Sequence, residues 1–180
     1  MSTHIQENTQ THHAPRDEAM ITGLRRQGVD FSHEEAWATA QEHVQVHRFF
    51  LGQDTGRPVS SDEGASSWKL NVFGPIFDAM RQYNTGFFFP RTDRDTLHMR
   101  ISDHWFFLKT NDPTVTADQA VVDYMRRFGS PLTRLAAAVL YGRENSRIQD
   151  RVATSDTIDQ RVMDMRSSVY ADARNWPVGQ

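Results

Sequence analysis

The sequence has no cysteine among its 180 residues. This absence excludes disulfide bonds, thiolate metal sites and catalysis by a cysteine nucleophile. It also fits a reducing compartment, where disulfides are rare. A chain of this length buries about two-thirds or more of its unfolded surface when it folds. It therefore needs no covalent staple, and we expect a single domain.

A strong positive charge and a long apolar run are also lacking. The formal net charge is −3 and the isoelectric point is near 6.2, whereas nucleic-acid-binding domains carry a basic patch that displaces counterions from phosphates. No stretch approaches the roughly 20 apolar residues that span a bilayer, and residues 1–16 resemble neither a signal peptide nor a membrane anchor. We therefore expect a cytoplasmic protein without membrane contact, and nucleic acid is a disfavoured partner.

The short motifs that carry enzyme chemistry are missing as well. The chain has no glycine-rich phosphate loop, no G-x-S-x-G elbow and no H-E-x-x-H metal motif, each of which holds reactive groups in a defined local geometry. Adjacent carboxylates such as Glu34 and Glu35 lie near a predicted helix start, where they favour the helix dipole. The sequence thus identifies no cofactor and no catalytic residue.

What the chain does contain is a series of amphipathic helices. Apolar residues recur at steps of three and four, as on one face of a helix. We predict helices over about 17–26, 32–51, 60–83, 92–110, 116–128 and 132–141, and a final helix that carries Ile158, Val162, Met165 and Val169. Gly74-Pro75 should kink or break the third helix. Residues 87–90 are predicted to be an apolar linker that could form a short strand.

Three of these helices begin with the pattern of a capping box. In this motif Ser or Thr, followed by Glu or Gln three residues later, satisfies free amide groups at the helix start. The pairs are Ser32 with Glu35, Ser60 with Glu63 and Thr116 with Gln119. A fourth start is predicted at Thr92 and Asp95.

The strongest pattern is an internal repeat. Residues 47–51 read HRFFL and residues 104–108 read HWFFL, so only the second position differs. With a one-residue gap in the turn, the same register aligns Val59-Ser60 with Val115-Thr116, Trp68 with Tyr124 and Pro75-Ile76 with Pro131-Leu132. The matched positions are helix caps, the apolar stripe and a helix-breaking proline. A fold requires these positions, so the match favours a true duplication.

These patterns predict an all-α protein built as a duplicated helical hairpin. The repeat units span about 32–83 and 92–141, and each is a helix, a tight turn and a second helix kinked at proline. One hairpin cannot bury its apolar face alone. Two facing hairpins can form a four-helix core, with extra N- and C-terminal helices around it. We expect one helical domain over 17–173, a flexible tail at 1–16 and another tail at 174–180.

Two histidines on one predicted helix are candidate metal ligands. His43 and His47 are four residues apart, the spacing that lets both imidazoles reach one metal ion. Asp103 and His104 are further candidates on a facing helix. The alternative is that His47 and His104, which recur in the repeat on the apolar stripe, are neutral core histidines. We favour this alternative, because a helical pair without an E-x-x-H partner motif is a weak metal signal.

A ligand pocket is the other candidate site. Helical bundles bind ligands between their helices, and His47, Trp68 and His104 are the residues that we expect at such a pocket, although aromatic residues at helical spacing are more often plain core. Arg57 lies in a Gly-Arg-Pro turn beside a capped helix start, where an anion could bind. The alternative is that Arg57 is an exposed turn residue.

Part of the chain resembles an uncharacterised helical domain of bacterial proteins. The likeness lies in the runs HRFFLGQDTGRPVSSDEGASSW, FFPRTDRDTLHMRISDHWFFL and VTADQAVVDYMRRFGSPL, over about residues 40–132. The family pattern is H-R-aromatic-aromatic-L-G…G-R-x-V…S-W followed by F-P-G-R-T-x-A-D-L-Y, and some members accompany universal-stress-type proteins. This chain departs from it at Gly64, at Leu97-His98 and in lacking the glycine after proline. The resemblance implies a helical register and a bacterial cytosolic setting, and it implies no activity.

The leading hypothesis is a non-enzymatic interaction or regulatory module. Its partner would be another protein or a second copy of the chain, met through residues 87–90 or the final helix. The alternative is a helical-bundle enzyme that binds a metal or small ligand through His43, His47 and His104. A nucleic-acid accessory protein is a third hypothesis.

Overall fold

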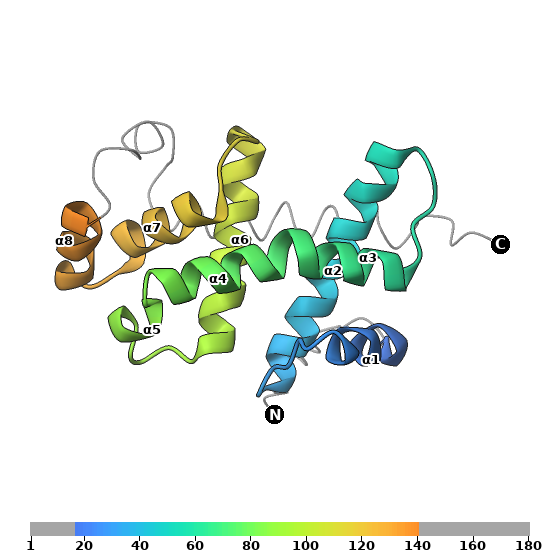
Figure 1. Ribbon diagram of the computed structural model, residues 1–180, viewed down its shortest axis with the longest axis horizontal. Coiled ribbons are helices and arrows are strands. Elements are labelled where there is room, and N and C mark those ends of the chain that lie inside the picture. Colours follow the sequence, from blue (N-terminus) through green and yellow to red (C-terminus); the bar gives the residue numbers. More distant parts are fainter. Residues whose placement is uncertain (1–16, 141–180) are drawn as a thin grey trace, which may run out of the picture.

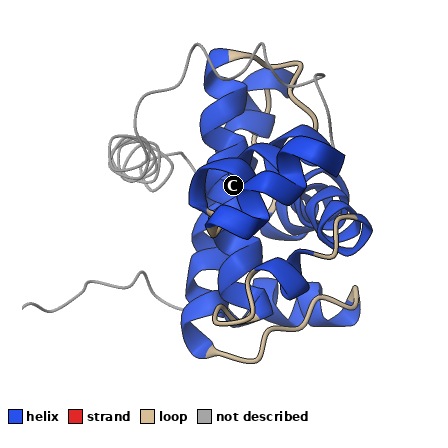
Figure 2. Cartoon of the chain, turned by 90° about the vertical axis from the view of Figure 1, so that its left-hand side faces the viewer, coloured by secondary structure: helices blue, strands red, loops and turns tan. Residues whose placement is uncertain are grey.

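The computed structural model describes residues 17–140, and these residues are all-helical (Figures 1 and 2). The elements are α1 (Glu18–Arg26), α2 (Glu34–Thr55), α3 (Ser61–Trp68), the π-helical segment η1 (Lys69–Phe73), α4 (Gly74–Gln82), α5 (Thr85–Phe88), α6 (Arg94–Asn111), α7 (Ala117–Phe128) and α8 (Pro131–Leu140). No β-strand occurs between residues 17 and 140. The all-α fold class is therefore confirmed. The predicted tails at 1–16 and 174–180 and the predicted helix with Ile158 lie outside the described residues.

The third predicted helix is continuous where the sequence suggested a kink or a break. Elements α3, η1 and α4 follow one another without a loop from Ser61 to Gln82, and they run across α2 and α6 in Figure 1. Pro75 lacks an N–H and its ring crowds the carbonyl of residue 71 in an ordinary α-helix. The wider π turn over residues 69–73 lies directly before Gly74-Pro75, and π-bulges of this kind relieve such a conflict without ending the helix.

The helix starts agree only in part with the predicted capping boxes. Thr116 has both bonds of a capping box, so this prediction is confirmed. Ser60 accepts the N–H of Glu63 as expected, but the Glu63 side chain turns to Arg57 instead. The prediction at Ser32 is wrong, because α2 has His33 at its N-cap and Ser32 donates its N–H to Asp95 on α6 (2.6 Å).

The first half of the segment predicted as an apolar linker belongs to a short helix. Residues Thr85–Phe88 form α5, which begins after Asn84 in the left-handed conformation (φ 49°). Thr85 is buried and its hydroxyl donates to the carbonyl of Met80 (3.4 Å), so the turn is tied to the end of α4. The short strand that the sequence left possible at 87–90 does not form, because residues 87–88 belong to α5.

Two hydrophobic cores lie along the shared helical segment 61–82. The N-terminal core is made of Met20, Ile21, Leu24, Val29, Phe31, Ala36, Trp37, Ala40, Val44, Ala65, Trp68 and Met99. The C-terminal core is made of Ile76, Ala79, Met80, Leu97, Ile101, Trp105, Phe107, Leu108, Val115, Ala117, Ala120, Val121, Tyr124, Met125 and Ala137. Val72, in the π turn, packs against both cores. The π turn thus lies where the two cores meet.

The helices pack in neighbouring pairs around these cores. Helix α2 packs on α3, α6 packs on α7, and α2 also contacts α6. Helix α1 covers α3, and α8 packs on α7 at the opposite end of the molecule (Figure 1). None of the helices in residues 17–140 has the length and hydropathy that crossing a bilayer requires.

The crossing of α2 and α3 depends on a glycine. A Cβ atom added to Gly64 would lie 2.9 Å from both Cβ and Cγ of Arg48. These atoms belong to the stem of the arginine side chain, close to the α2 backbone, so they cannot move aside freely. Gly64 therefore sets how closely the two helices approach.

We expect Gly64→Ala to destabilise the protein by about 1 kcal/mol. Alanine favours the helix by roughly 1 kcal/mol over glycine, but an overpacked contact costs about 1–3 kcal/mol. The matched control is Gly86→Ala on α5, where an added Cβ meets nothing within 4 Å and stability should not fall. Urea denaturation measures both variants, and equal stability of Gly64→Ala and the parent would contradict this account.

Candidate functional site

A cavity of about 180 Å³ lies between α2, the π turn and α6. Its lining residues are His43, Val46, His47, Phe50, Trp68, Asn71, Val72, Ser102, Asp103, Trp105, Phe106 and Lys109. Six of these twelve side chains are apolar, and the six polar ones come from α2, the π turn and α6. A mostly apolar cavity with a few convergent polar groups is the usual form of a small-ligand site.

One polar contact joins the two long helices at the cavity. His43 on α2 donates from Nε2 to Oδ1 of Asp103 on α6 (2.8 Å). The imidazole is buried, whereas the carboxylate is about a quarter exposed. This contact holds the α2 and α6 walls of the cavity together.

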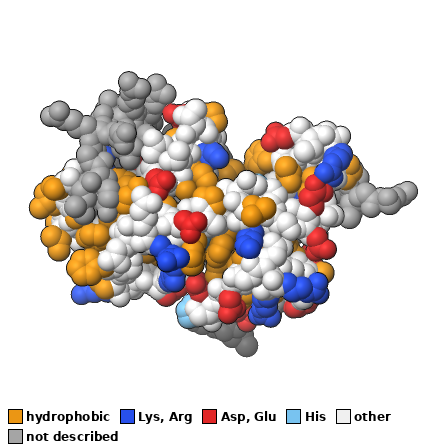
Figure 3. Space-filling view, in the orientation of Figure 1, with side chains coloured by type: hydrophobic (Ala, Val, Ile, Leu, Met, Phe, Trp, Pro, Cys, Tyr) orange, Lys and Arg blue, Asp and Glu red, His pale blue; other side chains and the backbone are white. Residues whose placement is uncertain are grey.

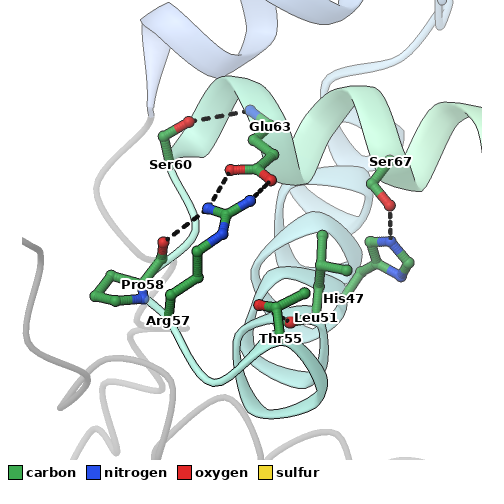
Figure 4. Close-up of polar contacts among 8 residues, drawn as sticks. All are labelled: His47, Leu51, Thr55, Arg57, Pro58, Ser60, Glu63 and Ser67. Carbon is green, nitrogen blue, oxygen red and sulfur yellow. Dashed lines mark hydrogen bonds and ion pairs between the residues drawn. The ribbon is translucent and has the colours of Figure 1, made fainter.

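A second polar contact joins α2 to α3. Nε2 of His47 is hydrogen-bonded to Oγ of Ser67 (2.9 Å) (Figure 4). The side-chain amide of Asn71 donates to the same hydroxyl (3.1 Å). Burial lowers the pKa of His47, and the charge of Lys109 lowers it further. His47 is therefore a neutral imidazole at pH 7, one turn along α2 from His43.

The two histidines proposed as metal ligands do lie on one wall of the cavity. Within residues 17–140, however, no group of three or more His, Cys, Asp or Glu side chains is placed to hold a metal ion. Nε2 of His43 is bonded to Asp103 and Nε2 of His47 to Ser67. A metal that bound both Nε2 atoms would have to displace both contacts.

His104 does not join the cavity, although the sequence grouped it with His47. It is buried between α6 and α7, and its Nε2 donates to Oδ2 of Asp123 (2.8 Å). The same oxygen accepts from Nε of Arg127 (2.7 Å). Burial acts to raise the pKa of Asp123, but the hydrogen bonds and charges of His104 and Arg127 together outweigh it and lower the pKa. His104 thus belongs to a closed structural network.

The other two candidates have different surroundings. Trp68 lines the cavity and is 1% exposed, as expected for a ligand-site residue that also belongs to the core. Arg57 lies outside the cavity, in the turn before α3, and its guanidinium binds both carboxylate oxygens of Glu63 (Figure 4). Glu63 thereby supplies the anion that a helix start favours, so a free anion at Arg57 would compete with it.

Asn71, Trp105 and Lys109 are among the cavity residues that the sequence did not single out as site candidates. Signals for two of them were available. Trp105 is the single position that differs between the two five-residue repeat motifs, and Lys109 is one of only two lysines in the chain. Asn71 gave no signal, because its role follows from the π turn that places it beside Ser67.

Comparison with known proteins yields no match for this chain. No family model, no curated protein and no solved structure matches it. The resemblance to an uncharacterised bacterial helical domain therefore stays a prediction.

A further buried imidazole lies behind the π turn. His98 on α6 donates from Nε2 to the carbonyl of Phe73 (3.2 Å). Burial lowers the pKa of His98 to about 4, although the Phe73 carbonyl favours the protonated form. The unfolded chain therefore takes up a proton on this residue before the folded chain does, between about pH 6.5 and pH 4.

We expect the free energy of unfolding to fall as the pH drops from 6.5 towards 4. The total loss attributable to His98 is about 3 kcal/mol. The sign follows because the folded form binds fewer protons in this window. His47, whose pKa is also lowered, adds to the trend. Chemical denaturation at several pH values measures the slope. His98→Gln should flatten it, and a slope equal to that of the parent would contradict the assignment.

Proposed function

We propose that this chain is a non-enzymatic protein-interaction or regulatory module. The observation that carries the proposal is an exposed apolar stripe on α8. Leu132, Leu135 and Val139 follow one another at steps of three and four, and they are 67%, 61% and 71% exposed. An apolar face of this kind marks a protein-binding surface more often than a free one.

The neighbouring helix α5 extends this surface. Phe87 on α5 is 69% exposed. The hydroxyl of Thr133 on α8 donates a hydrogen bond to the backbone carbonyl of Phe88 on α5 (3.3 Å), which links the two helices. Hydrophobic side chains gather at this end of the molecule in Figure 3. The α5–α8 face is defined here as Phe87, Leu132, Leu135 and Val139. It includes part of the aromatic segment that the sequence suggested as a contact region.

The three histidines that the sequence grouped lie in separate contacts. Nε2 of His43, His47 and His104 is hydrogen-bonded to Asp103, Ser67 and Asp123, respectively. The cavity favours a small-ligand function as the second candidate, while an enzyme that uses His43, His47 and His104 together is disfavoured because His104 lies in a separate network.

We also infer that the fold is a duplicated helical hairpin whose paired helices form a four-helix core. Matched contacts support this inference. In the repeat register His47 and Ser67 correspond to His104 and Asp123, and both pairs are hydrogen-bonded at similar length (2.9 and 2.8 Å). Each N-cap, Ser60 and Thr116, accepts the N–H of the third residue after it.

The two units differ at the proline. In the first unit the helix passes through Gly74-Pro75 by way of the π turn. In the second unit α7 ends at Phe128, and α8 begins at Pro131. This difference separates α8 from α7 and gives the second unit the helix that carries the exposed stripe.

Leu135→Glu should abolish an association made through the α5–α8 face. A charge in the centre of an apolar contact is desolvated without a partner and costs several kcal/mol. Light scattering of the full chain over a range of concentrations measures self-association, and binding of a fluorescent hydrophobic dye measures the exposure of the face. We expect the parent to self-associate or to bind the dye, and Leu135→Glu to reduce both.

The matched control is Leu70→Glu. Leu70 is 69% exposed, like the leucines of α8, but it lies on the π turn. It should leave association and dye binding unchanged. A parent protein that stays monomeric at every concentration, with dye binding equal to that of Leu135→Glu, would contradict the proposal.

A further inference from the structure

We propose that the cavity between α2, the π turn and α6 is a binding site for a compact aromatic monocarboxylate, with Lys109 as its charge partner. This site is separate from the α5–α8 face, so the two proposals can fail independently. Three observations support the ligand-binding proposal: the size of the cavity, the aromatic character of its walls, and Lys109 as the lysine among its described lining residues.

The volume limits the ligand to about one substituted ring. The cavity measures about 180 Å³, and an engineered apolar cavity of roughly 150 Å³ in another protein holds one benzene molecule. There is thus room for a benzene ring and a short substituent. A nucleotide, a haem or a flavin is far too large to enter.

The walls favour an aromatic ring over a chain of the same volume. Trp68, Phe50, Trp105 and Phe106 all line the cavity. The rings of Phe50 on α2 and Phe106 on α6 contact each other, with centroids 6.0 Å apart and planes tilted by 46°. Aromatic rings gain about 0.5–1.5 kcal/mol per pair from edge-to-face or offset contacts beyond the burial of their area.

The charge of the site favours an anion. Lys109 is exposed, and its ammonium lies 4.6 Å from the centroid of the Trp105 ring. No carboxylate in residues 17–140 forms a salt bridge with it. Asp103, the acidic residue of the lining, is held by His43. A carboxylate on the ligand would therefore find, at the edge of the cavity, an ammonium group with no salt-bridge partner in residues 17–140.

The remaining polar groups favour a single negative charge. His47 is neutral, and Asn71 is an amide. They can form hydrogen bonds with a ligand but cannot neutralise a second charge. The environment of His104, which corresponds to His47 in the repeat, is different. There Asp123 and Arg127 pack next to the imidazole, and their larger charged side chains close the site. At the cavity, Ser67 and Asn71 occupy the positions that correspond to Asp123 and Arg127, and their side chains are smaller.

Phenylacetate is a suitable probe, and phenylacetamide is its uncharged analogue of nearly the same shape. Each is titrated into the full chain while tryptophan fluorescence is recorded, since Trp68 and Trp105 both line the cavity. We expect saturable binding of phenylacetate and weaker binding of phenylacetamide. Lys109→Gln should weaken phenylacetate binding about fivefold, the change expected for one exposed charge pair, and leave phenylacetamide unaffected.

Lys69→Gln is the matched control. Lys69 is the other lysine of the chain and lies on the π turn, but it does not line the cavity. It should leave both titrations unchanged. Isotope-labelled lysine side chains add a direct readout, because the chain has only two lysines and Lys109 alone should shift with phenylacetate.

Val46→Phe fills the cavity without changing its charge. Val46 is buried on the α2 wall, and circular dichroism shows whether the variant keeps its fold. A folded Val46→Phe should lose binding of both probes. The proposal is overturned if phenylacetate shows no saturable binding, if phenylacetamide binds equally tightly, or if Lys109→Gln behaves like Lys69→Gln.

Discussion

The structure depends on one continuous helical segment, residues 61–82, that belongs to both hydrophobic cores at once. A proline in its interior would normally end or kink an α-helix, because it removes a hydrogen bond and crowds a carbonyl. The π turn over residues 69–73 absorbs this conflict. His98 supports the turn from α6 by bonding the carbonyl of Phe73. Without an unbroken segment, α1–α3 and α4–α8 would lose the element that fixes them against each other.

The cavity is a consequence of that arrangement. It lies where Trp68 of the N-terminal core and Trp105 of the C-terminal core approach the π turn. Close packing is achieved within each core, but two cores joined through a bulged helix need not fill the space between them. The π turn also brings Asn71 beside Ser67, so small polar side chains occupy the wall where larger groups would have closed it.

The sequence allowed the helices to be predicted well, because caps, apolar periodicity and turn residues act locally. The capping box at Thr116 and the helix that ends at Arg26 depend on neighbours in the chain. The errors arose where a distant residue intervened. Ser32 caps no helix because Asp95, far along the chain, takes its N–H. Similarly, Pro75 could be recognised as a conflict, but its solution by a π turn depends on packing against α6, which no local pattern reveals.

The same contrast governs the two histidines that the repeat aligns. A buried polar group usually has a hydrogen-bond partner. That partner can be a large side chain that fills the surrounding core or a small one that leaves a cavity beside it. At His104 the partners are Asp123 and Arg127, and the imidazole and carboxylate are 2% and 1% exposed, so the network specifies packing and nothing reaches it. At His47 the partner is Ser67, and the imidazole remains on a cavity wall. The two histidines therefore occupy matching positions in the repeat but differ in accessibility. The side chain that pairs with each imidazole determines whether solvent or a ligand can approach it.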